Sequence, residues 1–335
     1  MSHWFDVGDS VDPYSATVRF RGRRLGLRGK PGPTDAFVKD ERIDRVVPGS
    51  GPVSVTARVY GLAPGEWDVT AELVPTDPAG RARLAPKLKR RTRGATLPRA
   101  AWSWHRWSLS SGEFRPLVTR WAPLARLVSP PAVIPGSWIG LVTLGVAIGL
   151  GVQAALLSRA GIPGHESAAV TLVSLAVGLA AAKARYVMLH PRTWRTSLAE
   201  GWAVGGFLVV MPLVALAGLL VLDLAIGGFL NASTPALFFG VAVGRLGCFF
   251  TGCCAGRCSR SRWAIWSSDR RIGARRVPTQ LLESAVGLSL ALITLGVLLL
   301  VRPPVEGLVF ISALAAYFAA RSRLLPLRAE RQPAS

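Results

Sequence analysis

The sequence predicts a mainly α-helical polytopic membrane protein, with about six transmembrane helices and a β-rich extension at its N-terminus. Six apolar runs follow residue 135, and each is near the length of about 20 residues with which a helix crosses about 30 Å of hydrocarbon. Before them, apolar and polar residues alternate as in half-buried strands. The mean hydropathy of +0.36 and the 50% content of hydrophobic residues agree with a membrane protein that has a soluble appendage.

The N-terminal residues 1–77 carry the strand pattern. Val53, Val55 and Ala57 alternate with Ser54 and Thr56, and Pro-Gly pairs separate such runs. This pattern predicts an antiparallel, half-buried sheet. The stretch GLAPGEWDVTAEL resembles a strand–turn–strand of immunoglobulin or fibronectin type III sandwiches. We expect a soluble domain that acts as a lid, a spacer or a partner-binding module, or that has only a structural role.

Residues 78–135 are rich in Pro, Arg and Lys, with four interleaved tryptophans, Trp102, Trp104, Trp107 and Trp121. Basic and aromatic residues before a first span are typical of a segment at the head-group level of a membrane. A nucleic-acid-binding arm is the alternative, and the net charge of +21 is compatible with it. The adjacent spans already account for the pattern, so we predict membrane lipids as partners and no nucleic acid.

The remaining chain divides into a transmembrane region, 136–325, and a tail, 326–335. The expected spans are residues 138–157, 168–189, 202–222, 230–250, 281–301 and 307–320. The chain is therefore expected to be a multi-pass membrane protein.

A transporter would show an inverted internal repeat, which the sequence lacks. Charge bias places both termini in the cytoplasm.

The stretch from Gly244 to Glu283 joins two of the apolar runs and is too polar to lie in lipid. An arginine such as Arg245, at the end of an apolar helix, is costly unless it meets water, a partner or a lipid phosphate. The stretch is therefore a candidate functional site. The alternative is that Arg245 extends to the membrane surface and that the rest is an ordinary loop.

All four cysteines lie between Cys248 and Cys258. Cys253, Cys254 and Cys258 carry metal-binding side chains, but the spacing is not a paired C-x-x-C and no histidine is near, so we predict no metal and no cofactor. Beside Arg245, Cys248 is a candidate nucleophile or acyl carrier. The alternative is that the cysteines pack as small apolar residues at a helix end.

Three motifs in this stretch resemble one family. They read GRLGCF, GCCAGR and VPTQLLES, and a later helix reads EGLVFISALAAYFAARSRLL. The resemblance is to the prolipoprotein diacylglyceryl transferase family, most closely to its cysteine-bearing paralogues, and it covers residues 136–325. It implies location in a bacterial plasma membrane with the N-terminus on the outer side, which conflicts with the charge bias.

The resemblance implies transfer of a diacylglyceryl group from phosphatidylglycerol to a cysteine thiol, with release of glycerol phosphate. It implies phosphatidylglycerol and the signal-peptide region of a prolipoprotein as partners. The reaction needs positive charge on the leaving phosphate, which arginine supplies well because its guanidinium binds phosphate oxygens bidentately. The implied catalytic residues are Arg245, Arg321, Cys248 and Glu283. The implied lipid-binding residues are Arg245, Gly247, Gly256, Arg276, Gln280 and Arg321.

The chain departs from the family pattern mainly at groups that move protons. Val204 and Val277 stand where the family carries histidines, and Cys253 stands where it carries a glutamate. Phosphate-binding groups are thus retained better than candidate bases. A second hypothesis follows, in which the protein is a non-catalytic anionic-lipid-binding or scaffold protein of the same fold.

Overall fold

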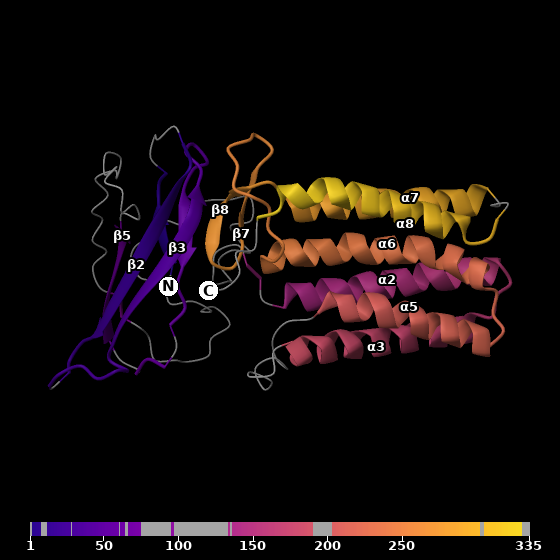
Figure 1. The fold of residues 1–335 in the computed structure, drawn as a ribbon, viewed down its shortest axis with the longest axis horizontal. Helices are drawn as coiled ribbons and strands as arrows, with labels where there is room; N and C mark the ends of the chain where they lie inside the picture. The colour runs from indigo at the N-terminus through magenta and orange to yellow at the C-terminus, as the bar shows by residue number, and fades with distance from the viewer. Residues whose placement is uncertain are drawn as a thin grey trace. The chain divides into compact units, whose positions relative to one another are not determined.

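A computed structural model describes residues 2–7, 12–27, 29–59, 61–63, 66–74, 95–96, 133–134, 136–189, 203–301 and 305–329. The strands in this part of the chain are β1 (Ser2–Phe5), β2 (Tyr14–Arg24), β3 (Ala36–Val46), β4 (Val53–Thr56), β5 (Glu66–Val74), β6 (Ala95–Thr96), β7 (Ile265–Ser268) and β8 (Ile272–Arg276). The helices are α2 (Ser137–Arg159), α3 (Gly164–Leu189), α5 (Val204–Val221), α6 (Ile226–Thr251), α7 (Thr279–Leu300) and α8 (Leu308–Leu324), followed by the short 3-10 helix η2 (Leu325–Leu327) (Figure 1).

The six helices confirm the predicted fold class. Each of them overlaps one of the six apolar runs, and the strands confirm a β-rich N-terminal region. Five helices are long and apolar enough to cross a membrane, and α5 is a shorter apolar helix. The interfacial segment predicted over residues 78–135 lies almost entirely outside the described residues.

The chain forms two compact units, each built from separate segments. The sandwich unit comprises Met1–Leu141, Gly244–Ser284 and Arg321–Ser335. The helical unit comprises Val142–Val243 and Ala285–Ala320. The sandwich unit thus contains every site residue that the motifs indicate.

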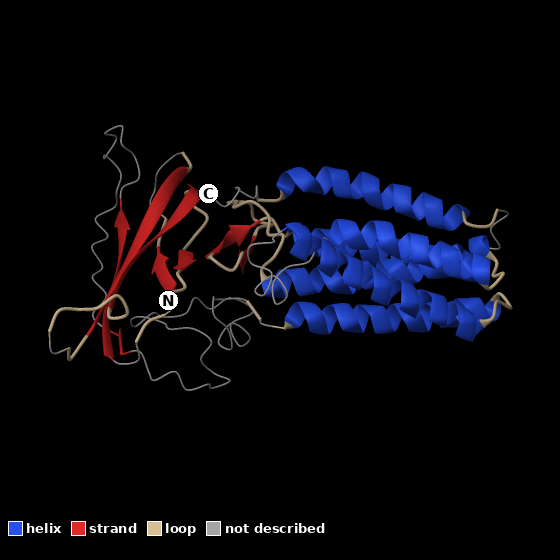
Figure 2. Cartoon of the chain, turned by 60° about the horizontal axis from the view of Figure 1, so that its bottom comes forward, coloured by secondary structure: helices blue, strands red, loops and turns tan. Residues whose placement is uncertain are grey.

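The helices of the helical unit lie side by side (Figure 2), and small residues allow them to pack closely. A Cβ on Gly149 of α2 would lie 2.8 Å from the carbonyl oxygen of Ala236 in α6. A Cβ on Gly206 of α5 would lie 2.7 Å from the carbonyl oxygen of Ala181 in α3. Such close backbone approach is typical of helices in membranes, where lipid gives no hydrophobic drive for helix association.

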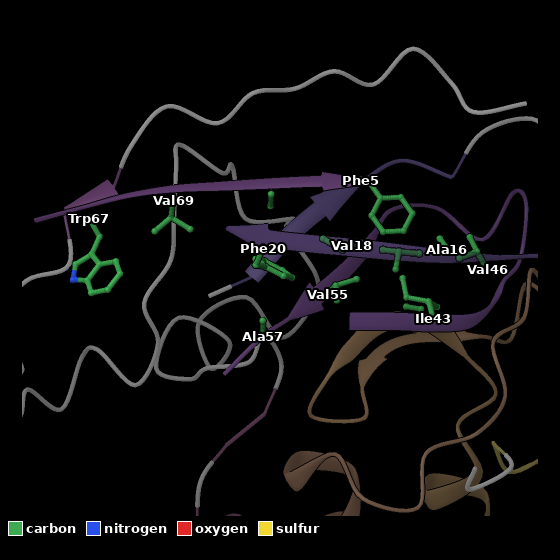
Figure 3. Close-up of a cluster of buried hydrophobic side chains, with 13 residues drawn as sticks. Phe5, Ala16, Val18, Phe20, Ile43, Val46, Val55, Ala57, Trp67 and Val69 are labelled. Atoms are coloured by element: carbon green, nitrogen blue, oxygen red, sulfur yellow. The ribbon is translucent and has the colours of Figure 1, made fainter. Parts of the chain in front are cut away.

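Two four-stranded sheets and a shared core form the β-rich part of the sandwich unit. Their strand orders are β1-β4-β8-β7 and β3-β2-β5-β6. The core takes buried side chains from both sheets, among them Phe20 of β2, Val55 of β4 and Trp67 of β5 (Figure 3). Alternating burial along β2 agrees with a strand that has one face on the core.

The hairpin β7–β8, between α6 and α7, completes the first sheet. Strand β8 pairs antiparallel with β4 in the register Ser54↔Gly273 and Val55↔Ile272. Its Ala274 is 1% exposed and belongs to the sandwich core. Strand β4 of the N-terminal region therefore pairs directly with the segment that carries the three motifs.

The prediction of a half-buried sheet is wrong for β4, because both faces of this strand are buried. Ser54 and Thr56 are 0% and 2% exposed. On the same sheet, the Trp4 and Trp266 rings stack at 5.2 Å, and a Cβ on Gly273 would lie 2.4 Å from the Ser54 hydroxyl and 2.5 Å from the Trp266 ring. The alternating pattern predicts that the face of β4 with Ser54 is exposed, but the tryptophan side chains on this sheet bury it.

Candidate functional site

The end of α6 provides the first part of the site. The helix carries Arg245 and Cys248 in its last two turns. Between them, Gly247 lets α2 approach, because a Cβ there would lie 3.1 Å from the Cα of Trp138. Gly252 follows with a φ of 71°, a left-handed conformation that glycine adopts without steric cost and that commonly ends a helix.

The turn after α6 is held by the first residues of α7. The Gln280 side-chain amide donates a hydrogen bond of 2.9 Å to the Cys253 carbonyl, and the Thr279 hydroxyl donates one of 3.3 Å to the Cys254 carbonyl. Gln280 is 3% exposed and Thr279 is fully buried. Gln280, a predicted lipid-binding residue, thus fixes the backbone of the turn.

Glu283, one turn further along α7, is surrounded by three guanidinium groups. Its Oε2 accepts from Arg245 Nε at 2.7 Å and from Arg321 Nη1 at 3.3 Å, and its Oε1 accepts from Arg328 Nη2. Arg245, Arg321, Arg328 and Glu283 are named here the arginine cluster. Three cations around one anion leave the cluster strongly cationic.

The exposure of these side chains indicates which groups a ligand can reach. The Glu283 side chain is 1% exposed, whereas those of Arg245, Arg321 and Arg328 are 17%, 29% and 19% exposed. The carboxylate is thus enclosed, while each arginine side chain keeps part of its surface accessible. Partly buried arginines with an accessible surface are suited to bind an anionic group such as a phosphate.

Sequence reasoning missed Arg328, which it assigned to the tail. The short helix η2 follows α8, and the chain then forms a β-bridge in which Arg328 is opposite Gly256. The Arg257 amide donates to the Leu327 carbonyl and the Ala329 amide to the Ala255 carbonyl, each at 2.9 Å. This non-local pairing brings Arg328 to Glu283, and no motif in the sequence signals it.

Gly256 is required by the close approach of two backbone segments. A Cβ at this position would lie 2.0 Å from the carbonyl oxygen of Val277. The same strip of backbone carries the bridge to Arg328. The structure therefore places Gly256, like Gly247, where main chains meet.

Arg276 lies apart from the arginine cluster. It is 3% exposed, donates to the Asp269 carboxylate at 2.7 Å, and also donates to the Gly256 carbonyl at 3.1 Å. Its guanidinium also bonds the Ile272 carbonyl within its own hairpin. These contacts connect the hairpin β7–β8 to the turn after α6.

The four cysteines divide into a group of three and a separate residue. Cys248, Cys253 and Cys254 form the group at the end of α6, where the Cys253 amide and thiol both donate to the Cys248 carbonyl, at 3.0 Å and 3.7 Å. Cys258 packs against the sandwich core, where burial raises its thiol pKa. Within the described ranges, no group of three or more His, Cys, Asp or Glu side chains is arranged to hold a metal ion.

A comparison with protein families decides the family of the chain. Residues 133–332 match the model of prolipoprotein diacylglyceryl transferase. The chain belongs to the prolipoprotein diacylglyceryl transferase family. A search of curated proteins finds no match to the chain. Its family membership and its apolar helices indicate a multi-pass membrane protein. The family is one of transferases in lipoprotein biosynthesis.

The matched residues of this diacylglyceryl transferase family member contain the whole arginine cluster, the group of cysteines and the hairpin β7–β8. Strands β1 to β6 precede the match. Of these additional strands, β4 pairs with both β1 and β8, so β1 and β4 share one sheet with the hairpin of the segment that carries the family motifs.

Proposed function

We propose that the protein is a phosphatidylglycerol–prolipoprotein diacylglyceryl transferase of a bacterial plasma membrane. The observation that supports this proposal is the arginine cluster, in which three guanidinium groups from separate segments surround one buried carboxylate. The substrates are phosphatidylglycerol and the cysteine near the signal peptide of a prolipoprotein. The family match supports the same reaction type.

In this mechanism the acceptor thiolate attacks a glyceryl carbon of phosphatidylglycerol. The carbon–sulfur bond forms while the bond from that carbon to the phosphate oxygen breaks, and the electron pair leaves on glycerol phosphate. Arg245, Arg321 and Arg328 stabilise the negative charge that grows on the leaving group. Glu283 accepts hydrogen bonds from all three and thereby fixes their positions.

A non-catalytic anionic-lipid-binding or scaffold protein is the second candidate. The observation that favours it is the chemistry of position 277, where a valine side chain cannot move a proton. In this candidate the arginine cluster binds the phosphate of phosphatidylglycerol, and the β-sandwich recruits a partner. The two candidates share the lipid and differ in whether a covalent bond is made.

The deciding experiment measures transfer of labelled diacylglyceryl from phosphatidylglycerol to a lipobox peptide by the purified full-length protein. Arg245→Ala and Arg321→Ala are expected to abolish transfer, whereas Arg323→Ala, on an exposed position of the same helix α8, is expected to retain it. If the wild type transfers no diacylglyceryl group but binds phosphatidylglycerol, and both substitutions weaken this binding, the enzyme is rejected and the second candidate is retained.

A further inference from the structure

Arg328 depends on backbone pairing for its place in the arginine cluster. It lies beyond helix α8 and the short helix η2, in a segment that forms an antiparallel bridge with Gly256. Two amide–carbonyl hydrogen bonds of 2.9 Å, one on each side of the bridge, hold the two segments together. The contacts that hold Gly256 therefore also determine where the Arg328 guanidinium meets Glu283.

The Gly256 carbonyl points away from the segment of Arg328 and towards the hairpin β7–β8. The two bonds of the bridge join the neighbours of Gly256 and Arg328, so these two residues form a non-hydrogen-bonded pair of the antiparallel kind. Arg276, the last residue of β8, donates to the Gly256 carbonyl from Nη1 at 3.1 Å. Gly256 thus has Arg328 at one edge and Arg276 at the other.

Arg276 is itself held by the hairpin. Its side chain is enclosed, with the residue 3% exposed, and its Nη2 donates to the Asp269 carboxylate at 2.7 Å and to the Ile272 carbonyl at 3.2 Å. Asp269 also accepts from the Ile272 amide at 2.6 Å, within the turn of the hairpin. Strand β8 then pairs with β4 of the N-terminal region. One planar guanidinium therefore connects the sandwich to the backbone that carries Arg328.

We propose that Arg276 is a positioning residue that sets Arg328 in the lipid-phosphate site through the Gly256 carbonyl. This inference rests on the proposed function. Arg276 is enclosed and its two Nη atoms bond groups of the protein, so it acts on the lipid through Arg328. Without Arg276, the buried Gly256 carbonyl loses a hydrogen-bond donor and the bridge loses its support at one edge. The strands that precede the family match thereby contribute to the geometry of a site that lies within it.

The first test compares single and double variants in diacylglyceryl transfer from phosphatidylglycerol to a lipobox peptide, with the full-length protein in nanodiscs. Arg276→Gln alone is expected to lower transfer at least about fivefold. In the Arg328→Gln background, Arg276→Gln is expected to lower transfer by less than a further factor of about two, because residues that act through one another have non-additive effects. Losses that multiply in the double variant would overturn the inference.

Two further variants separate positioning from a general loss of charge on β8. Arg276→Lys is expected to recover only part of the transfer, because an ammonium lacks the fork that bonds the carboxylate and the carbonyl together. Arg275→Gln is the matched control on the same strand, since Arg275 bonds the Ser261 and Ala264 carbonyls. It is expected to retain transfer, and an equal loss in Arg275→Gln and Arg276→Gln would contradict the assigned role.

The second test requires neither lipid nor peptide. Amide hydrogen exchange of the full-length protein in detergent reports opening of the bridge, because the Arg257 and Ala329 amides donate its two bonds. Arg276→Gln is expected to speed exchange of both amides at least about tenfold. Strand β2, in the other sheet, is the internal control for the fold and should keep its wild-type rates.

Unchanged exchange at both amides in Arg276→Gln would overturn the inference, whatever the transfer assay shows. A wild type that transfers nothing would instead reject the proposed function. Faster exchange at both amides would then still support Arg276 as the residue that holds the segment of Arg328.

Discussion

The guanidinium of Arg328 donates a hydrogen bond to the carboxylate of Glu283, although 45 positions separate the two residues in the sequence. The contact exists because the segment after α8 pairs with the turn after α6. A residue from the end of the described chain thus belongs to the same cluster as Arg245 and Arg321. This relationship makes the segment around Arg328 part of the proposed lipid-phosphate site.

Arg328→Gln is expected to reduce diacylglyceryl transfer by about tenfold to a hundredfold, because a hydrogen bond to a charged group is worth about 1.5–3 kcal/mol. Arg328→Lys is expected to recover only part of the activity, since an ammonium lacks the planar fork of the guanidinium. The measurement is the transfer rate at saturating peptide over a range of phosphatidylglycerol contents. Arg323→Gln is the matched control, and equal rates for the two Gln variants would exclude a role of Arg328.

Glu283→Gln is expected to destabilise the protein by about 3–5 kcal/mol, because it leaves three partly buried cations without their anion. The thermal unfolding temperature in detergent measures this loss, and Glu72→Gln, on an exposed side chain, is the control. Added phosphatidylglycerol is expected to raise the unfolding temperature more in Glu283→Gln than in the wild type, since the lipid phosphate replaces the missing charge. A smaller rise in the variant would contradict this account of the cluster.

Gly256→Ala is expected to disrupt the bridge between Gly256 and Arg328, because the added Cβ would lie 2.0 Å from the Val277 carbonyl oxygen. Both the unfolding temperature and transfer should fall. Gly296→Ala, within α7, is the control because a Cβ there meets nothing within 4 Å. Alanine is a better helix former than glycine by about 1 kcal/mol, so this control should be at least as stable as the wild type. Similar losses in both variants would argue against a local cause at Gly256.

The parts of the fold that depend on local pattern were predictable from the sequence. Apolar runs long enough to cross the thickness of a membrane located all six helices. A helix in lipid needs such a run regardless of which helices it contacts. The sequence pattern predicts no strand at the positions of β7 and β8. Strand β8 pairs with β4, which is more than 200 residues away, and a four-residue or five-residue strand carries little pattern of its own.

The candidate site was predictable in part for the same reason. Arg245, Glu283 and Arg321 lie at helix ends that the family motifs mark, and the structure brings all three together. Arg276 lies beside one of these motifs, yet its contacts go to Asp269 and to backbone carbonyls. Adjacency in sequence does not determine the direction of a side chain on a strand, where successive residues point to opposite faces.

His3 of β1 makes the stability of the sandwich depend on pH. Burial lowers its pKa from 6.5 to about 4. Between these values the unfolded chain binds a proton and the folded chain does not, so stability is full above pH 6.5 and falls as the pH approaches 4. His3→Leu should lessen this acid sensitivity, measured as the difference in unfolding temperature between pH 7 and pH 4.5. An unchanged difference would show that His3 does not contribute to it.

Arg271 and Glu41 connect the hairpin β7–β8 to strand β3, and the coupling between them is measurable. Arg271 donates to Glu41 Oε2 from Nη2 at 2.7 Å and from Nε at 3.2 Å, and the Glu41 side chain is only 9% exposed. A double-mutant cycle with Glu41→Gln and Arg271→Gln is expected to give a coupling free energy of about 1 kcal/mol. The exposed pair Arg19–Asp40, within the second sheet, is the control and should couple more weakly. A coupling near zero for Glu41 and Arg271 would mean that backbone pairing and core contacts alone join the hairpin to the N-terminal strands.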